Sequence, residues 1–234
     1  RVREMAGHLL DAAVPTAASP GGGPRLLVLP ETFATGFSMD AERMASFADQ
    51  TRTFLAELAR EQGAHVLAGY AEPAVPRPAN ACSLLNPQGE EILHYRKIHP
   101  FSLGGEDEHY LAGDSLATAE VGGTRVTPLI CYDLRFPELF RAAAADTDLF
   151  CVLANWPSRR RHAWSTLLRA RAMENQAYVL GLNRVGEGGG EPHVGDSVLL
   201  GPLGEEIAAA PEGQVAIVSG QVDRVEVLHT HFVN

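Results

Sequence analysis

Apolar and polar positions along this chain alternate in a way that predicts strands separated by helices. In residues 51–62, Phe54, Leu55 and Leu58 share one helical face, and Gly63 marks the expected end of the helix. Several of the predicted strands are apolar throughout and lie between helices, which predicts sheets covered by helices. We expect helices at residues 3–13, 51–62, 137–145 and 162–175, and strands near 25–30, 65–71, 81–86, 91–96, 126–131, 149–154, 178–184, 196–201, 205–209 and 214–219.

One internal repeat divides the predicted strands into two sets. Leu-Leu-Asn-Pro-Gln-Gly-Glu-Glu-Ile at residues 84–92 recurs as Leu-Leu-Gly-Pro-Leu-Gly-Glu-Glu-Ile at residues 199–207. In each copy, proline at the second and glycine at the fourth position of the turn are typical of a type I turn between two strands. One good turn used twice would explain the repeat. We favour two pseudo-equivalent halves, each with its own hairpin, in two sheets packed face to face.

The composition agrees with one globular domain and argues against some classes of binding partner. The chain has 234 residues, 45% of them hydrophobic, which is enough for a single large core. Nineteen basic and 29 acidic residues give a formal net charge of −10, which argues against nucleic acid or an anionic membrane as a partner. No apolar stretch reaches the ~18–20 residues of a membrane span. The apolar patch at residues 8–18 is interrupted by Asp11 and Pro15, so it is a poor signal peptide.

Three cysteines at wide spacing do not form a disulfide framework, and they indicate a reducing, cytoplasmic compartment. Cys82 and Cys151 lie inside apolar runs and are expected to be core thiols. Cys131 differs, because it ends an apolar strand and is followed by polar residues and a proline that open the helix at residues 137–145. At such an elbow a side chain is accessible to substrate, and N–H groups at the start of the helix can stabilise a thiolate or an oxyanion.

Two further charged residues end strand-like runs. Glu31 follows the apolar residues 25–30, and Lys97 follows residues 91–96. Burial at a strand end is expected to raise the pKa of Glu31, which suits a general base. A lysine near Cys131 favours the thiolate and can stabilise a developing oxyanion. Each residue alone has an ordinary structural explanation, but their joint placement at three strand ends favours a base, an electrostatic stabiliser and a nucleophile.

The segments around these residues resemble the three signatures of the nitrilase superfamily, the carbon–nitrogen hydrolases. Lys97 lies 66 residues after Glu31, and Cys131 lies 34 residues after Lys97. The signatures are Leu-Leu-Val-Leu-Pro-Glu, Tyr-Arg-Lys-Ile-His and Leu-Ile-Cys-Tyr-Asp-Leu-Arg-Phe-Pro-Glu-Leu, and further likeness at residues 154–157, 169–179 and 181–186 extends over nearly the whole chain. Within the superfamily, residues 105–110 and the Asn-Trp-Pro segment look most like the omega-amidase branch.

The resemblance implies an α/β fold, a four-layer αββα sandwich of the nitrilase type, in one domain spanning residues 1–234. It also implies a homodimer or higher homo-oligomer, and a reaction without metal or organic cofactor. The family normally begins with a strand before the first helix. The start at Arg1–Met5 therefore indicates that this first strand is missing, and the tail at residues 225–232 also departs from the usual ending.

The three residues suggest attack on an amide carbonyl, and the resemblance implies that the substrate is a small linear amide. Glu31 would take the thiol proton while Cys131 attacks the carbonyl, and Lys97 with a backbone N–H would hold the oxyanion. Ammonia would leave a thioester, which water activated by Glu31 would hydrolyse. The resemblance implies a second glutamate, for which Glu106 and Glu108 compete; counting back from Gly113-Asp114 favours Glu106.

Several other polar residues have competing interpretations. We expect Tyr132, Asn155 and Trp156 to bind the substrate. The run at residues 159–161 is usually a solvated face, although one of these arginines can reach a substrate carboxylate at the pocket mouth. The remaining expectations are an arginine partner for a buried Glu174, a pair between Arg135 and Glu138, a flexible loop and not a phosphate cradle at residues 186–190, and no metal site at His229 and His231.

Other function classes fit the sequence less well. No Gly-x-Ser-x-Gly elbow occurs, which argues against a serine hydrolase, and no ligand set has the spacing of a zinc hydrolase. An N-carbamoyl amino acid amidohydrolase or a nitrilase would use the same three residues. A catalytically silent interaction scaffold is the alternative outside enzymes. The products of the reaction would separate these possibilities, because a carbamoylase also yields carbon dioxide.

Overall fold

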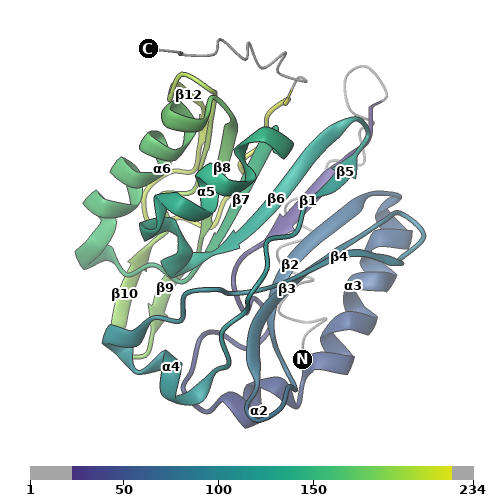
Figure 1. Ribbon diagram of the computed structural model, residues 1–234, viewed down its shortest axis with the longest axis vertical. Helices are drawn as coiled ribbons and strands as arrows, with labels where there is room; N and C mark the ends of the chain where they lie inside the picture. The colour runs from purple at the N-terminus through teal and green to yellow at the C-terminus, as the bar shows by residue number, and fades with distance from the viewer. Residues whose placement is uncertain (1–22, 223–234) are drawn as a thin grey trace.

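The computed structural model describes residues 23–222, and in that range two sheets lie face to face (Figure 1). The first has the order β1-β2-β3-β4 and the second the order β12-β11-β8-β7-β6-β5. The first sheet consists of β1 (Leu26–Leu29), β2 (His65–Glu72), β3 (Ala79–Leu85) and β4 (Glu91–Arg96). The second consists of β5 (Ala119–Val121), β6 (Thr124–Ile130), β7 (Leu149–Ala154), β8 (Tyr178–Asn183), β11 (Val198–Leu200) and β12 (Glu206–Ala209). The predicted helix at residues 3–13, the expected missing first strand, the tail at residues 225–232 and the pair His229 and His231 lie outside the described residues.

Helices cover the outer faces of both sheets. Figure 1 shows α3 (Ala48–Gln62) on the first sheet, and α5 (Pro137–Ala143) with α6 (Arg161–Asn175) on the second. Two short helices, α2 (Ala41–Ala45) and α4 (Glu106–His109), lie at one end of the first sheet. Leu67 of β2 packs in the core that joins the two sheets, whereas its neighbours Val66 and Ala68 pack against α3. This alternation confirms the predicted helix–sheet–sheet–helix layering.

Most predicted elements are confirmed, with ends that differ by a few residues. Helix α3 buries Phe54, Leu55 and Leu58 and ends at Gly63, whose left-handed φ of 54° favours glycine. The predicted strand at residues 214–219 is wrong. This segment forms neither helix nor strand, and its apolar residues Val215 and Ile217 are exposed.

The glycine-rich residues 186–190, predicted as a flexible loop, instead form the turn and most of the first strand of a hairpin. Its strands are β9 (Val185–Gly188) and β10 (Glu191–Val194), joined by Gly189 and Gly190 at φ 61° and 77°. Glycine adopts these left-handed angles without the strain that another residue would meet, so the same residues that suggested flexibility close a tight turn. Elements α2, α4 and β5 were not predicted, because each is too short for a periodic pattern.

The repeated turn occurs once in each sheet, as predicted. Gly89 N–H donates to the Asn86 carbonyl at 2.8 Å between β3 and β4, and Gly204 N–H donates to the Gly201 carbonyl at 2.9 Å between β11 and β12. A register shift follows the first leucine of the repeat in both hairpins, at Leu84 and at Leu199. The two halves therefore share a local construction, in support of the pseudo-equivalence.

Parallel pairing brings the carboxyl ends of the central strands to one edge. Strand β1 pairs parallel to β2, and β6, β7 and β8 pair parallel to one another. Residues that follow these strands therefore converge, as ligands and catalytic groups do in open α/β sheets. Within residues 23–222, no helix has the length and apolar character that crossing a membrane requires.

Candidate active site

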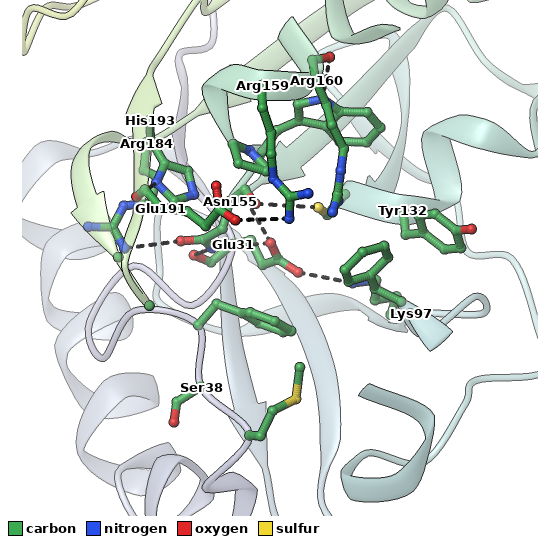
Figure 2. A pocket seen from close by; sticks show the side chains of 18 residues that line it. Glu31, Ser38, Lys97, Tyr132, Asn155, Arg159, Arg160, Arg184, Glu191 and His193 are labelled. Carbon is green, nitrogen blue, oxygen red and sulfur yellow. Dashed lines mark hydrogen bonds and ion pairs between the residues drawn. The ribbon is translucent and has the colours of Figure 1, made fainter. Parts of the chain in front are cut away.

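A cavity of about 390 Å³ opens where these strand ends meet (Figure 2). Glu31 follows β1, Lys97 follows β4, Cys131 follows β6 and Asn155 follows β7. Six of the seven residues expected at the site line this cavity: Glu31, Lys97, Cys131, Tyr132, Asn155 and Trp156. The seventh, Glu106 of α4, lies directly against Lys97, with 2.7 Å between Glu106 Oε2 and Lys97 Nζ.

Cys131 occupies a strained elbow. Its φ is +48°, a left-handed value that is uncommon for residues other than glycine and costs on the order of 1 kcal/mol. The chain then forms one 3₁₀ segment, Cys131–Arg135, and helix α5 begins only at Pro137. The thiol therefore does not sit at the start of the long helix, as the sequence pattern suggested. The elbow instead turns the side chain of Cys131 into the cavity.

The buried carboxylate of Asp133 fixes this elbow from behind. It accepts hydrogen bonds from Ile130 N–H at 3.0 Å, from the Tyr95 hydroxyl at 2.7 Å and from His99 N–H at 2.9 Å. These donors come from the end of β6 and from the segment that carries Lys97. Asp133 thus ties the backbone of the nucleophile to the backbone of the lysine.

Lys97 is buried between two carboxylates. Its Nζ lies 3.2 Å from Glu31 Oε1 and 2.7 Å from Glu106 Oε2, and each of the three side chains is at most 1% exposed. Glu108 is exposed, so Glu106 and not Glu108 is the second glutamate at the lysine. Burial lowers the pKa of Lys97, but the adjacent Glu106 and Glu31 raise it well above its ordinary value, so the amine remains a cation.

The pKa of Glu31 shifts in the opposite direction to the sequence-based prediction. Burial raises it, but the Lys97 charge and hydrogen bonds from Asn80 and Asn155 together hold it below its ordinary value. Asn80 Nδ2 donates to Glu31 Oε1 at 2.8 Å, and the Asn155 backbone N–H donates to Oε2 at 2.7 Å. The prediction of a raised pKa is therefore wrong. It considered burial alone, whereas the charge of Lys97 and the hydrogen-bond donors from distant parts of the chain outweigh the effect of burial.

The thiol of Cys131 has a pKa well above its ordinary value. Burial is the largest cause, the negative charge of Glu31 adds to it, and the charge of Lys97 opposes it without prevailing. Lys97 does favour the thiolate, as expected, but burial and Glu31 outweigh its effect on the pKa of Cys131. An ionised Glu31 beside a protonated Cys131 is the arrangement that a general base requires.

Asn155 directs its donors at Glu31. Its Nδ2 lies 2.8 Å from the Glu31 carbonyl oxygen and 3.1 Å from Oε2. The side chain that we expected on the substrate thus holds the carboxylate, and a substrate contact for Asn155 stays a prediction. Tyr132 packs edge-on against Phe101, with ring centroids 5.1 Å apart, and the largely buried Trp156 forms part of the cavity wall.

Arginines surround the mouth of the cavity. Arg160 lines it, with its guanidinium 4.5 Å from the centre of the Phe101 ring. Arg159 also lines it and pairs with Glu191 at 2.9 Å, whereas Arg161 pairs with Asp196 and Glu212 and lies outside the cavity lining. Figure 2 shows Arg159 and Arg160 extending into the same space from one side.

Sequence reasoning missed several residues at the site. Arg184, after β8, lines the cavity with its Nη1 3.5 Å from Asn155 Oδ1, and His193 of β10 lies in the wall. Asn80 offered a signal, since it is a polar residue inside the otherwise apolar start of β3, and such buried polar groups require partners. Arg184 offered a positional signal, because it directly follows β8 at the edge where the parallel strands end. His193 offered none, because only the unpredicted hairpin brings β10 to the cavity.

Of the two ion pairs predicted from the sequence, one is present in the structure and the other is not. Glu174 pairs with Arg171 at 2.9 Å, as expected, but its side chain is 36% exposed and not buried. Among the described residues no ion pair joins Arg135 to Glu138. The guanidinium of Arg135 instead lies 5.1 Å from the Trp156 ring and 6.0 Å from the Tyr132 ring, because both aromatic faces are near the elbow. Cys82 and Cys151 are fully buried, which confirms them as core thiols.

Comparison with protein families agrees with this geometry. The family model described as carbon-nitrogen hydrolase matches residues 3–231. The chain belongs to the carbon–nitrogen hydrolase family. The omega-amidase YafV of Yersinia enterocolitica is 41% identical over 198 residues, which cover 84% of this chain and 77% of that protein. The 2-oxoglutaramate amidase of Bacillus subtilis is 32% identical, over 86% of this chain and 79% of that protein.

Solved structures of carbon–nitrogen hydrolases have the same fold. A CN-hydrolase superfamily protein of Xanthomonas campestris, with an arsenic adduct in its active site, has a TM-score of 0.83 and 32% identity, over 93% of this chain and 83% of that one. A mutant amidase of Nesterenkonia sp. AN1 has a TM-score of 0.78 and 28% identity, over 89% of this chain and 80% of that one. In that structure the acetamide moiety of fluoroacetamide is covalently attached to the active-site cysteine.

The burial of the three thiols predicts selective labelling of this carbon–nitrogen hydrolase. Cys131 lines the cavity, whereas Cys82 and Cys151 are fully buried. Iodoacetamide should therefore add one carbamidomethyl group to the native protein, at Cys131, and three after denaturation. Peptide mass spectrometry locates the label. Native labelling at Cys82 or Cys151 in preference to Cys131 would contradict this structure of the site.

Proposed function

We propose that this carbon–nitrogen hydrolase is an amidase that releases ammonia from a small linear amide through a thioester on Cys131. The observation that carries the proposal is the buried Lys97, held between Glu31 and Glu106 at the wall of the cavity that Cys131 lines. In this proposal Glu31 is the general base, Lys97 stabilises the oxyanion and Glu106 holds the lysine in place.

The resting charges support a proton transfer coupled to attack. Glu31 takes the thiol proton as the Cys131 sulfur bonds to the amide carbon, and the carbonyl oxygen becomes an oxyanion beside the Lys97 ammonium. The intermediate then collapses, the carbon–nitrogen bond breaks, and ammonia leaves with the proton from Glu31. Water, deprotonated by Glu31, attacks the thioester and releases the carboxylic acid and the thiol. The thiol proton leaves with ammonia and a proton from water restores the thiol, so Glu31 and Cys131 end the cycle as they began it, and the reaction needs only water besides the groups of the chain.

Substrates with a carboxylate at the far end fit the cavity best. Arg160 and Arg184 line it, and among the described residues neither forms an ion pair with a carboxylate. Arginine binds carboxylates through two parallel hydrogen bonds, and partial burial strengthens such contacts. The names of the omega-amidase and 2-oxoglutaramate amidase relatives agree with a small amide of this kind, such as alpha-ketoglutaramate. A volume of about 390 Å³ is near the lower end for small-molecule sites.

Ammonia release from a substrate panel tests the proposal. We expect wild-type protein to hydrolyse alpha-ketoglutaramate, and Cys131→Ala to lose at least about 10³-fold in kcat while remaining folded. Cys82→Ala is the matched control, because it removes a buried thiol outside the cavity and should keep near-normal turnover. The panel also contains glutamine, an N-carbamoyl amino acid and a simple nitrile.

Other results from the substrate panel would indicate a different function. Release of carbon dioxide with ammonia from the carbamoyl compound would indicate a carbamoylase, and preference for the nitrile would indicate a nitrilase. Turnover by Cys131→Ala at the wild-type rate would end the nucleophile assignment. If the folded protein hydrolyses none of the four compounds, the result would favour another amide as substrate or the catalytically silent scaffold. A cytoplasmic compartment and a homodimer stay predictions.

Arg160 gives the carboxylate preference a separate test. Arg160→Gln should raise KM for alpha-ketoglutaramate by about 10–100-fold, since a hydrogen bond between charged groups contributes about 1.5–3 kcal/mol. Hydrolysis of butyramide, which has no carboxylate, should change little. Arg161→Gln is the matched control from the same stretch of arginines, because Arg161 forms ion pairs with Asp196 and Glu212 and does not line the cavity. Equal losses on both substrates would contradict a carboxylate contact at Arg160.

A further inference from the structure

Asn80 lies between the two glutamates of the site and donates hydrogen bonds to both. It belongs to β3, is 1% exposed, and donates from Nδ2 to Glu31 Oε1 at 2.8 Å and to Glu106 Oε1 at 2.9 Å. Its backbone carbonyl accepts a hydrogen bond from Lys97 N–H at 2.8 Å. One residue therefore contacts all three members of the buried charge cluster.

The chemistry of the neighbours fixes the orientation of this amide. Ionised carboxylates only accept hydrogen bonds, so the NH₂ group of Asn80 must face Glu31 and Glu106. Its Oδ1 is then buried without a hydrogen-bond partner among the described residues. An unpaired buried carbonyl is unfavourable, and an apolar residue in this apolar strand would avoid it. The donor function of Asn80 is the feature that compensates for this cost.

We propose that Asn80 is a positioning residue, whose amide holds the Glu31 and Glu106 carboxylates on either side of Lys97 while both are negatively charged. This inference rests on the proposed function of Glu31 as the base. Asn80 acts through the two glutamates and not on the substrate, because it does not line the cavity.

The electrostatics of the cluster explain why a donor is needed there. Both carboxylates accept a hydrogen bond from the same nitrogen of Asn80, at 2.8 and 2.9 Å, so their negative charges are neighbours, and neighbouring like charges favour protonation of one of them. The other charged or titratable groups around the cluster are Lys97, Cys131 and Tyr110, the last of which donates its hydroxyl proton to the Ser38 carbonyl. Lys97 is the cation that offsets the two carboxylates. Asn155 also donates to Glu31 and the Phe101 N–H to Glu106, but the Nδ2 donors of Asn80 are the ones that the two carboxylates share. Loss of those donors would make Glu31 easier to protonate, and a protonated Glu31 cannot act as a base.

The pH dependence of kcat/KM for alpha-ketoglutaramate, or for the best substrate of the panel, tests this proposal. Asn80→Ala should lower kcat by about 10²-fold with a smaller change in KM, and should move the acid limb up by about one pH unit. Asn80→Asp should move it further, because three carboxylates then share one lysine. Asn80→Ser keeps a shorter donor and should lie between wild type and Asn80→Ala.

Asn175→Ala is the matched control. Asn175 is also a buried asparagine with an unpaired Oδ1, but it lies in α6 and donates to the Arg171 carbonyl. Its loss should lower thermal stability without moving the acid limb. An unmoved acid limb in folded Asn80→Ala and Asn80→Ser, with only a uniform loss of rate, would overturn the positioning role. These two variants keep the test decisive if Asn80→Asp does not fold.

Glu31→Gln separates this inference from the proposed function. If the residual activity of Glu31→Gln retains the wild-type acid limb, Glu31 is not the base and the proposed function fails at that step. If Glu31→Gln removes the limb and the Asn80 variants leave it unmoved, the base assignment stands and only the role of Asn80 fails. The rate of Cys131 alkylation against pH provides a second readout that needs no substrate, and it should shift in the same direction.

Discussion

The buried ammonium of Lys97 between Glu31 and Glu106 is the interaction on which the site depends. Three full charges without solvent are tolerable only when each is paired and hydrogen-bonded, and loss of one partner from such a group typically costs about 3–5 kcal/mol. The Lys97–Glu106 contact is 2.7 Å long, and Asn80, Asn155 and the backbone N–H of Phe101 complete the shells of the two carboxylates. These groups come from β3, from α4 and from the segments that follow β1, β4 and β7, so both sheets must be in place for the cluster to exist.

The same cluster determines the ionisation state from which chemistry starts. Lys97, Asn80 and Asn155 keep the pKa of Glu31 below its ordinary value, while burial and Glu31 itself keep that of Cys131 above its own. A resting thiol is less exposed to adventitious oxidation or alkylation than a thiolate, because the thiolate is the nucleophile. In the proposed reaction the thiol loses its proton as the sulfur attacks the carbonyl carbon. The negative charge then develops on the carbonyl oxygen beside Lys97, whose preorganised positive charge stabilises the transition state.

Much of this site can be predicted from the sequence, since its reactive residues follow strands with strong apolar patterns. Glu31, Lys97 and Cys131 each end such a run, and Glu106 was favoured over Glu108 by counting. The wrong predictions share one cause. The sign of the Glu31 pKa shift depends on the Lys97 charge and on donors from Asn80 and from Asn155, the last of which is 124 residues away in the chain, and His193 reaches the cavity only through the unpredicted hairpin β9–β10. Local sequence patterns predict that a side chain is buried, but they do not predict which distant residues donate hydrogen bonds to it and offset the cost of burial.

Detection of the acyl-enzyme would test the central claim most directly. Wild-type protein mixed with excess amide and quenched in acid within its turnover time should gain the mass of the substrate less ammonia. Peptide mapping should locate that mass on Cys131, and hydroxylamine should remove it, as expected of a thioester. The adduct should be present during turnover, and its level should fall once the substrate is exhausted. Rapid turnover with no adduct on Cys131 at any quench time, together with full activity of a Cys131→Ala variant, would contradict this claim.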